Sequence, residues 1–113
     1  ETYVTVGDND PTLTKDCLEY YASLYLDGND PENPLISPLF GDVSGFPPSL
    51  IFVGSSEILL DDAARIHKKL RESGSKSSIY IAKNMWHAYI LYGVSPSSLN
   101  HSQIGNFIKD VVR

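Results

Sequence analysis

Cysteine, basic residues and long apolar runs are all scarce in this sequence. The one cysteine, Cys17, has no second thiol to pair with, so no intrachain disulfide is expected. This fits either a reducing, cytoplasmic location or simply a fold that does not depend on disulfides. Nine Lys and Arg residues stand against fourteen Asp and Glu residues, and the net charge of −5 disfavours nucleic acid or an anionic membrane as a partner. No apolar run approaches the roughly eighteen residues of a membrane span.

The length of the chain limits what it can be. With 113 residues it is at most one small domain, below the usual size of an α/β enzyme. Its first residues, Glu1-Thr2-Tyr3, include neither a methionine nor a signal-peptide pattern, so we expect an excerpt or a proteolytic product of a longer polypeptide. The apolar fraction of 42% and the charged fraction of 20% are those of an ordinary globular protein.

Apolar periodicity predicts two strands and three helices. The first helix carries Cys17 on its apolar stripe, where we expect it to fill the core, with Asp10-Pro11-Thr12 as the helix entry and Gly28 as the exit. Residues 29–48 hold five prolines and two glycines, which excludes regular structure over most of that segment. The predicted elements are a helix at about Leu13–Leu26, a strand at Ser49–Val53, a helix at Leu59–Ser73, a strand at Ser77–Ala82 and a helix at about Ser102–Val112.

The order strand, helix, strand, helix predicts an α/β unit in which the two strands are parallel and joined by a crossover. Two parallel strands do not make a stable sheet alone, because such sheets are covered on both faces and continue at their edges. We therefore expect the chain to be the edge of something larger. Either a missing N-terminal half of the same polypeptide or a second copy, in a homodimer, would complete the sheet.

An acid and a histidine follow the two predicted strands. Glu57 comes just after the first strand and His87 just after the second, and loops at the carboxyl ends of parallel strands converge on one crevice. This order suits the acid and base of a serine hydrolase triad. Two other interpretations remain open at this point: Glu57 as a charge at a helix N-terminus, and His87 as a histidine packed beside Trp86.

Other residues are weaker candidates for chemistry. No G-x-S-x-G elbow and no separate Gly-rich oxyanion loop occur, and Ser56 and Ser95 each stand in only half of such a pattern, so we expect neither to be a nucleophile. Asp61, Asp62 and His67 lack a second histidine at a ligand spacing, so no metal site and no cofactor are expected.

An ordered series of motifs makes a family resemblance specific. Taken together they resemble the C-terminal third of α/β-hydrolases of the hormone-sensitive lipase family, and within it bacterial acetyl esterases and lactone hydrolases. Residues 1–113 then form the C-terminal fragment of a single α/β-hydrolase domain without its nucleophile-bearing part. The motifs are Pro31-Glu32-Asn33-Pro34-Leu35-Ile36-Ser37-Pro38-Leu39-Phe40-Gly41-Asp42, Phe46-Pro47-Pro48, Val53-Gly54-Ser55-Ser56-Glu57 and Trp86-His87-Ala88-Tyr89.

The resemblance also implies roles for residues. Family members carry Asp-Pro-Leu-x-Asp at the acid site, and the matching segment Glu57-Ile58-Leu59-Leu60-Asp61 places Glu57 at the triad acid and His87 at the general base. The change from Asp to Glu leaves Asp61 and Asp62 as alternative acids. The implied reaction is esterase or lipase-like hydrolysis of a small acyl ester or lactone, with this chain inactive by itself. The alternative is a non-catalytic assembly domain that forms a homodimer.

Overall fold

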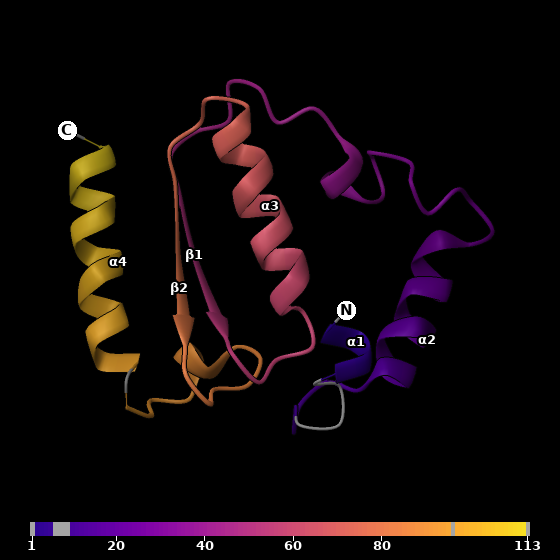
Figure 1. Cartoon of the computed structure of the whole chain (residues 1–113), viewed down its shortest axis with the longest axis horizontal. Coiled ribbons are helices and arrows are strands. Elements are labelled where there is room, and N and C mark those ends of the chain that lie inside the picture. Colours follow the sequence, from indigo (N-terminus) through magenta and orange to yellow (C-terminus); the bar gives the residue numbers. More distant parts are fainter. Residues whose placement is uncertain (1, 6–9, 96, 113) are drawn as a thin grey trace.

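The computed structural model describes residues 2–5, 10–95 and 97–112. Figure 1 shows the elements in chain order as a central pair of strands with helices around them. They are α1 (Thr2–Thr5), α2 (Lys15–Leu26), the 3-10 helix η1 (Pro38–Phe40), β1 (Ser49–Gly54), α3 (Leu60–Glu72), β2 (Ser77–Ala82), the 3-10 helix η2 (Tyr89–Leu91) and α4 (Ser97–Val111).

The strands β1 and β2 are parallel, and their register runs from Ser49 opposite Ser77 to Gly54 opposite Ala82. Helix α3 makes the crossover between them and packs against both strands, while α4 lies on the other side of the strands (Figure 1). The predicted α/β class, two parallel strands with flanking helices, is confirmed. Within the described part of the chain each strand has one partner only, so both outer edges of the sheet lack a neighbour.

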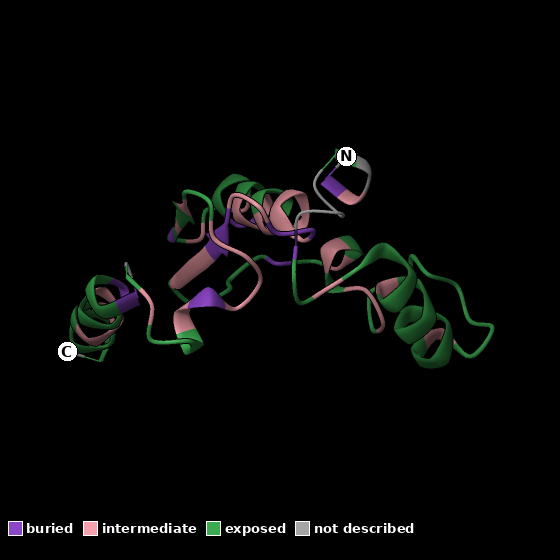
Figure 2. Cartoon of the chain, turned by 90° about the horizontal axis from the view of Figure 1, so that it is seen from below, coloured by how far each residue is buried: buried purple, intermediate pink, exposed green. Residues whose placement is uncertain are grey.

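The buried core is small and lies around β1, α3 and η2. Figure 2 shows most of the buried residues in the middle of the molecule, with a few more in α1 and at the start of α4, while most of α2 and of α4 is exposed. Helix α4 begins at Ser97, five residues earlier than the sequence indicated. The buried apolar side chains are Val43, Val53, Ile58, Leu70 and Tyr89.

Helix α2 forms where the first helix was predicted, but its apolar side chains are not buried as predicted. It begins at Lys15 after an N-cap at Thr14, whose side chain accepts a hydrogen bond from the Cys17 amide. No residue of α2 is buried, and Cys17 is exposed, so its expected role as core filler is wrong. The apolar stripe is present, with Tyr20 61% and Leu24 62% exposed, but nothing in the described part of the chain covers it.

The proline-rich segment lies on α3, which supplies the packing surface that such a loop requires. The Lys69 ammonium donates to the Leu39 carbonyl at 2.7 Å, and the Ser73 hydroxyl donates to the Val43 carbonyl at 3.2 Å. These contacts fix the loop that leads into β1. Among the described helices none is long and apolar enough to cross a bilayer.

Candidate active site

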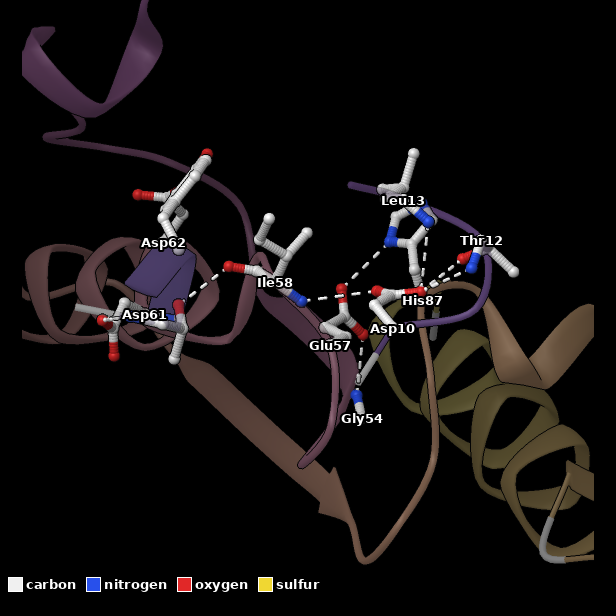
Figure 3. Close-up of polar contacts among 11 residues, drawn as sticks. Asp10, Thr12, Leu13, Gly54, Glu57, Ile58, Asp61, Asp62 and His87 are labelled. Atoms are coloured by element: carbon white, nitrogen blue, oxygen red, sulfur yellow. Dashed lines mark hydrogen bonds and ion pairs between the residues drawn. The ribbon is translucent and has the colours of Figure 1, made fainter. Parts of the chain in front are cut away.

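Glu57 and His87 come together at the carboxyl ends of the two strands. The His87 Nδ1 atom lies 3.0 Å from Glu57 Oε1, and Figure 3 shows the imidazole directed at the carboxylate. Glu57 is 5% exposed, whereas the His87 side chain is 37% exposed. Because a carboxylate only accepts hydrogen bonds, this contact assigns a proton to Nδ1, and in the neutral imidazole the lone pair then lies on Nε2, where another group can use it.

The second oxygen of Glu57 is also bound. Its Oε2 atom accepts a hydrogen bond from the Gly54 amide at 2.8 Å, so the carboxylate is held from the strand on one side and by the imidazole on the other. Both oxygens of a nearly buried carboxylate are therefore satisfied, as the low dielectric around it requires. The side chain can rotate only by giving up one of these two bonds.

Gly54 brings the loop that carries Glu57 (residues 55–59, the acid loop) against the loop that carries His87 (residues 83–88, the histidine loop). A Cβ atom at this position would overlap the carbonyl group of Met85 and lie 2.9 Å from the Trp86 carbonyl oxygen. Beyond the strands the two loops continue to bond, with the Ser56 amide donating to the Met85 carbonyl at 3.0 Å and the Asn84 amide donating to the Ser55 hydroxyl at 2.8 Å. The sequence indicated Gly54 only as the end of a strand.

A buried network fixes the chain just after His87. Tyr89 is 1% exposed and donates from its hydroxyl to Asn100 Oδ1 at 2.7 Å, and Asn100 Nδ2 donates to Gln103 Oε1 at 2.9 Å. This network ties α4 to η2. Burial, and after it the negative charge of Glu57, raises the pKa of Tyr89 above its ordinary value.

The substitution Tyr89→Phe tests this network. Removal of the hydroxyl leaves Asn100 Oδ1 without its donor, which should lower the free energy of unfolding by about 1 to 2 kcal/mol. The pKa of Tyr89 is higher in the folded state than in the unfolded state, so the benefit is complete below about pH 10 and declines at higher pH. Urea denaturation of both proteins at neutral pH and above pH 10 should show this difference shrinking. An equal difference at both pH values would contradict the account.

The alternative acids lie on the other side of the acid loop. Asp61 Oδ2 accepts from the Thr2 amide at 2.7 Å, and Asp62 Oδ2 accepts from the Tyr3 hydroxyl at 3.1 Å. Burial and the adjacent Asp62 carboxylate raise the pKa of Tyr3 to about 12. Both aspartates thus anchor α1 to the start of α3, whereas it is Glu57 that contacts the imidazole.

The remaining candidates are not gathered at this site. His67 Nδ1 bonds to the hydroxyl of Ser77, at the opposite end of β2 from His87, with a separation of 2.8 Å. Ser95 is exposed, and Ser56 contributes its backbone amide to the joined loops. Among the described residues no three acidic, histidine or cysteine side chains are grouped as a metal ion would require.

One residue close to Glu57 was not predicted from the sequence to lie near the site. Asp10, interpreted as a helix entry, is 4% exposed, and its Oδ2 atom accepts a hydrogen bond from the amide of Ile58, the residue after Glu57, at 3.3 Å. Asp10-Pro11-Thr12 was predicted as the helix entry, but α2 begins at Lys15 after the N-cap Thr14, and Asp10 instead forms a local turn with Thr12. No feature of the sequence signals a contact made across 48 positions.

Comparison with known proteins identifies the family. A family model described as the alpha/beta hydrolase fold matches residues 1–91. An esterase of Acinetobacter venetianus is 36% identical over 85 residues, which cover 74% of this chain and 28% of that protein. An acetyl-hydrolase of Streptomyces hygroscopicus is 40% identical over 75 residues, 66% of this chain and 25% of that protein. The chain therefore spans about a quarter of the length of these curated relatives.

Solved structures give the same result. A crystal structure of an esterase from the bacterial hormone-sensitive lipase family superposes with a TM-score of 0.94 and 30% identity, covering 100% of this chain and 39% of that one. The hormone-sensitive lipase homologue EstE7, from a metagenome library, superposes with a TM-score of 0.95 and 31% identity, covering 100% of this chain and 40% of that one. The chain belongs to the α/β-hydrolase family, and within that family its similarity is to the hormone-sensitive lipase esterases.

Proposed function

We propose that this chain is the C-terminal part of a carboxylic ester hydrolase, an acetyl esterase or lipase-like enzyme, in which it supplies two members of a catalytic triad. Glu57 is the acid and His87 the general base. The observation that carries this proposal is the 3.0 Å bond between His87 Nδ1 and Glu57 Oε1, with Nε2 left available. Esterase and acetyl-hydrolase names among the relatives favour the same chemistry.

The proposed reaction proceeds through an acyl-serine intermediate. As a serine hydroxyl attacks the ester carbonyl, His87 Nε2 takes its proton, and Glu57 stabilises the imidazolium that forms. The tetrahedral intermediate then collapses, and the same proton passes from Nε2 to the departing alcohol. Water repeats the sequence on the acyl-enzyme and releases the carboxylic acid. No metal or cofactor takes part in any of these steps.

The serine and the oxyanion hole belong, in this proposal, to an N-terminal part of the same domain. The 113 residues contain no G-x-S-x-G elbow, and the relatives are several times longer. The unpaired edge of β1 and an open, apolar groove of about 650 Å³ between η1, β1 and α3 offer this part a place to pack. We infer that the groove is filled by the missing part rather than by a second copy. The substrate class is a small acyl ester or lactone, and the location is cytoplasmic.

The test compares turnover and mass in solution. Light scattering and p-nitrophenyl acetate hydrolysis are measured on the same peak, first for this chain and then for the complete polypeptide that carries the serine elbow. We expect no turnover above background from the chain alone and clear turnover from the complete polypeptide. Serine-dependent turnover by the chain alone would refute its inactivity. A stable dimer of the chain, together with an inactive complete polypeptide, would favour the non-catalytic assembly domain instead.

A further inference from the structure

Ile58 is held on both sides by residues from the start of the chain. It follows Glu57 directly and its side chain is completely buried. Its amide donates to Asp10 Oδ2 at 3.3 Å, and its carbonyl accepts from the Thr2 hydroxyl at 2.8 Å. In Figure 3 Asp10 lies beside the Glu57 loop, close to the Glu57–His87 pair. The backbone immediately after the acid is thus fixed by side chains about fifty positions away.

The Asp10 carboxylate is fully engaged. Its Oδ1 atom accepts from the Thr12 amide at 2.9 Å, the Thr12 hydroxyl at 2.7 Å and the Leu13 amide at 3.2 Å, while Oδ2 accepts from Ile58. Burial alone would raise the pKa of this carboxyl, but the hydrogen bonds outweigh burial and hold the pKa below its ordinary value. Asp10 is therefore a buried anion whose charge is balanced by donors.

A local turn does not require this burial. Asp42 makes the same kind of turn, accepting from the Ser44 amide and the Ser44 hydroxyl at 2.8 Å each, yet it is exposed to solvent. Burying a carboxylate costs free energy unless every oxygen is satisfied. Asp10 accepts two further bonds that Asp42 lacks, a local one from the Leu13 amide and a long-range one from the Ile58 amide. Only the bond to Ile58 reaches beyond the turn.

We propose that Asp10 is a positioning residue for the triad acid, because it anchors the Ile58 amide and so holds Glu57 in reach of His87. The inference rests on the proposed function, in which Glu57 orients the imidazole. Gly54 holds the carboxylate from the strand side, and Asp10 holds the backbone on the other side of Glu57. Loss of the second anchor lets the loop shift, and displacements of about 1 Å in a catalytic group lower rates by about a hundredfold.

The substitution Asp10→Asn removes this anchor without a change in size. The one carbonyl oxygen of Asn suits the three donors of Thr12 and Leu13, so its NH₂ group faces the Ile58 amide, where two donors cannot bond. In the complete polypeptide we expect kcat for p-nitrophenyl acetate to fall by about ten- to a hundredfold, with KM changed by less than about twofold. Amide exchange at Ile58 should become faster. Each rate is divided by the concentration of active sites, which is titrated with a fluorophosphonate. Unfolded molecules then do not lower the kcat that is obtained.

Asp42→Asn is the matched control, because it removes the same charge from the same kind of turn away from the acid loop. Its kcat should equal that of the wild type. Suppose that Glu57→Gln has lost turnover but Asp10→Asn keeps the kcat of the wild type. This result would overturn the role of Asp10 and leave the proposed function intact. Wild-type turnover by Glu57→Gln would overturn the proposed function itself. Equal losses of kcat in the Asp10 and Asp42 variants would also overturn the role of Asp10.

Discussion

Replacing Glu57 by glutamine in the complete polypeptide is expected to lower kcat for p-nitrophenyl acetate about ten-thousandfold. The Gly54 amide holds the oxygen of the new side chain, so the NH₂ group of glutamine faces His87 Nδ1. Nδ1 must then become the acceptor, and the proton moves to Nε2, where it blocks removal of the serine proton. A loss of this size accompanies the wrong histidine tautomer in serine hydrolases. Initial rates at neutral pH, with ¹⁵N NMR of the imidazole, measure both effects.

Asp61→Asn is the control for this prediction. It also removes one carboxylate close to Glu57 in the sequence, but that carboxylate lies in the first turn of α3 and accepts from the Thr2 amide. We expect kcat to change by less than about twofold, in the range of a surface substitution. If Asp61→Asn abolished turnover and Glu57→Gln preserved it, Asp61 would be the triad acid and the assignment made here would be wrong.

Gly54→Ala is expected to destabilise the fold by about 3 kcal/mol or more. The added methyl group would occupy the space of the Met85 carbonyl, which is backbone and cannot swing aside as a side chain can. The acid and histidine loops would have to separate, and with them Glu57 and His87. Urea denaturation measures the loss, and turnover by the complete polypeptide should disappear as well.

The chain also offers a matched glycine. Gly105 lies inside α4, and apart from its chain neighbours and the adjacent helix backbone no atom would come within 4 Å of a Cβ atom there. Gly105→Ala should therefore stabilise the protein by up to about 1 kcal/mol, because alanine loses less conformational freedom in a helix. We expect the free energy of unfolding to fall in Gly54→Ala and to rise in Gly105→Ala. A neutral Gly54→Ala would show that the two loops do not approach each other as described.

The elements that position the site were predictable because each carries its own local signal. The strand before Glu57 is a short apolar run bounded by turn residues, and the strand before His87 alternates Ile79 and Ile81 with Ser78 and Tyr80. Helix α3 has an amphipathic repeat that places Leu70 inside. Strand order then places Glu57 and His87 at one edge of the sheet. Topology thus brought Glu57 and His87 together at one edge, whereas the choice of Glu57 over Asp61 and Asp62 as the acid came from the family resemblance.

The contacts that refine the site were not predictable, because they depend on residues distant in the sequence. The pattern around Asp10 describes its turn but not its bond to Ile58, and nothing near Gly54 reveals the Met85 carbonyl that excludes a side chain. Periodicity likewise placed α2 correctly but predicted burial for Cys17. An apolar stripe indicates that a helix packs against a partner, but it does not indicate whether that partner lies within the same 113 residues.

The location of the reactive serine decides whether this chain supplies only the acid and the base of the triad. The complete polypeptide is treated with a fluorophosphonate, which labels an activated serine, and the adduct is located by mass spectrometry of its peptides. We expect a single adduct, on a serine outside these 113 residues. We also expect this adduct to be lost when His87 is replaced by alanine. An adduct on a serine of this chain, such as Ser56 or Ser95, would contradict the claim that the chain supplies only the acid and the base.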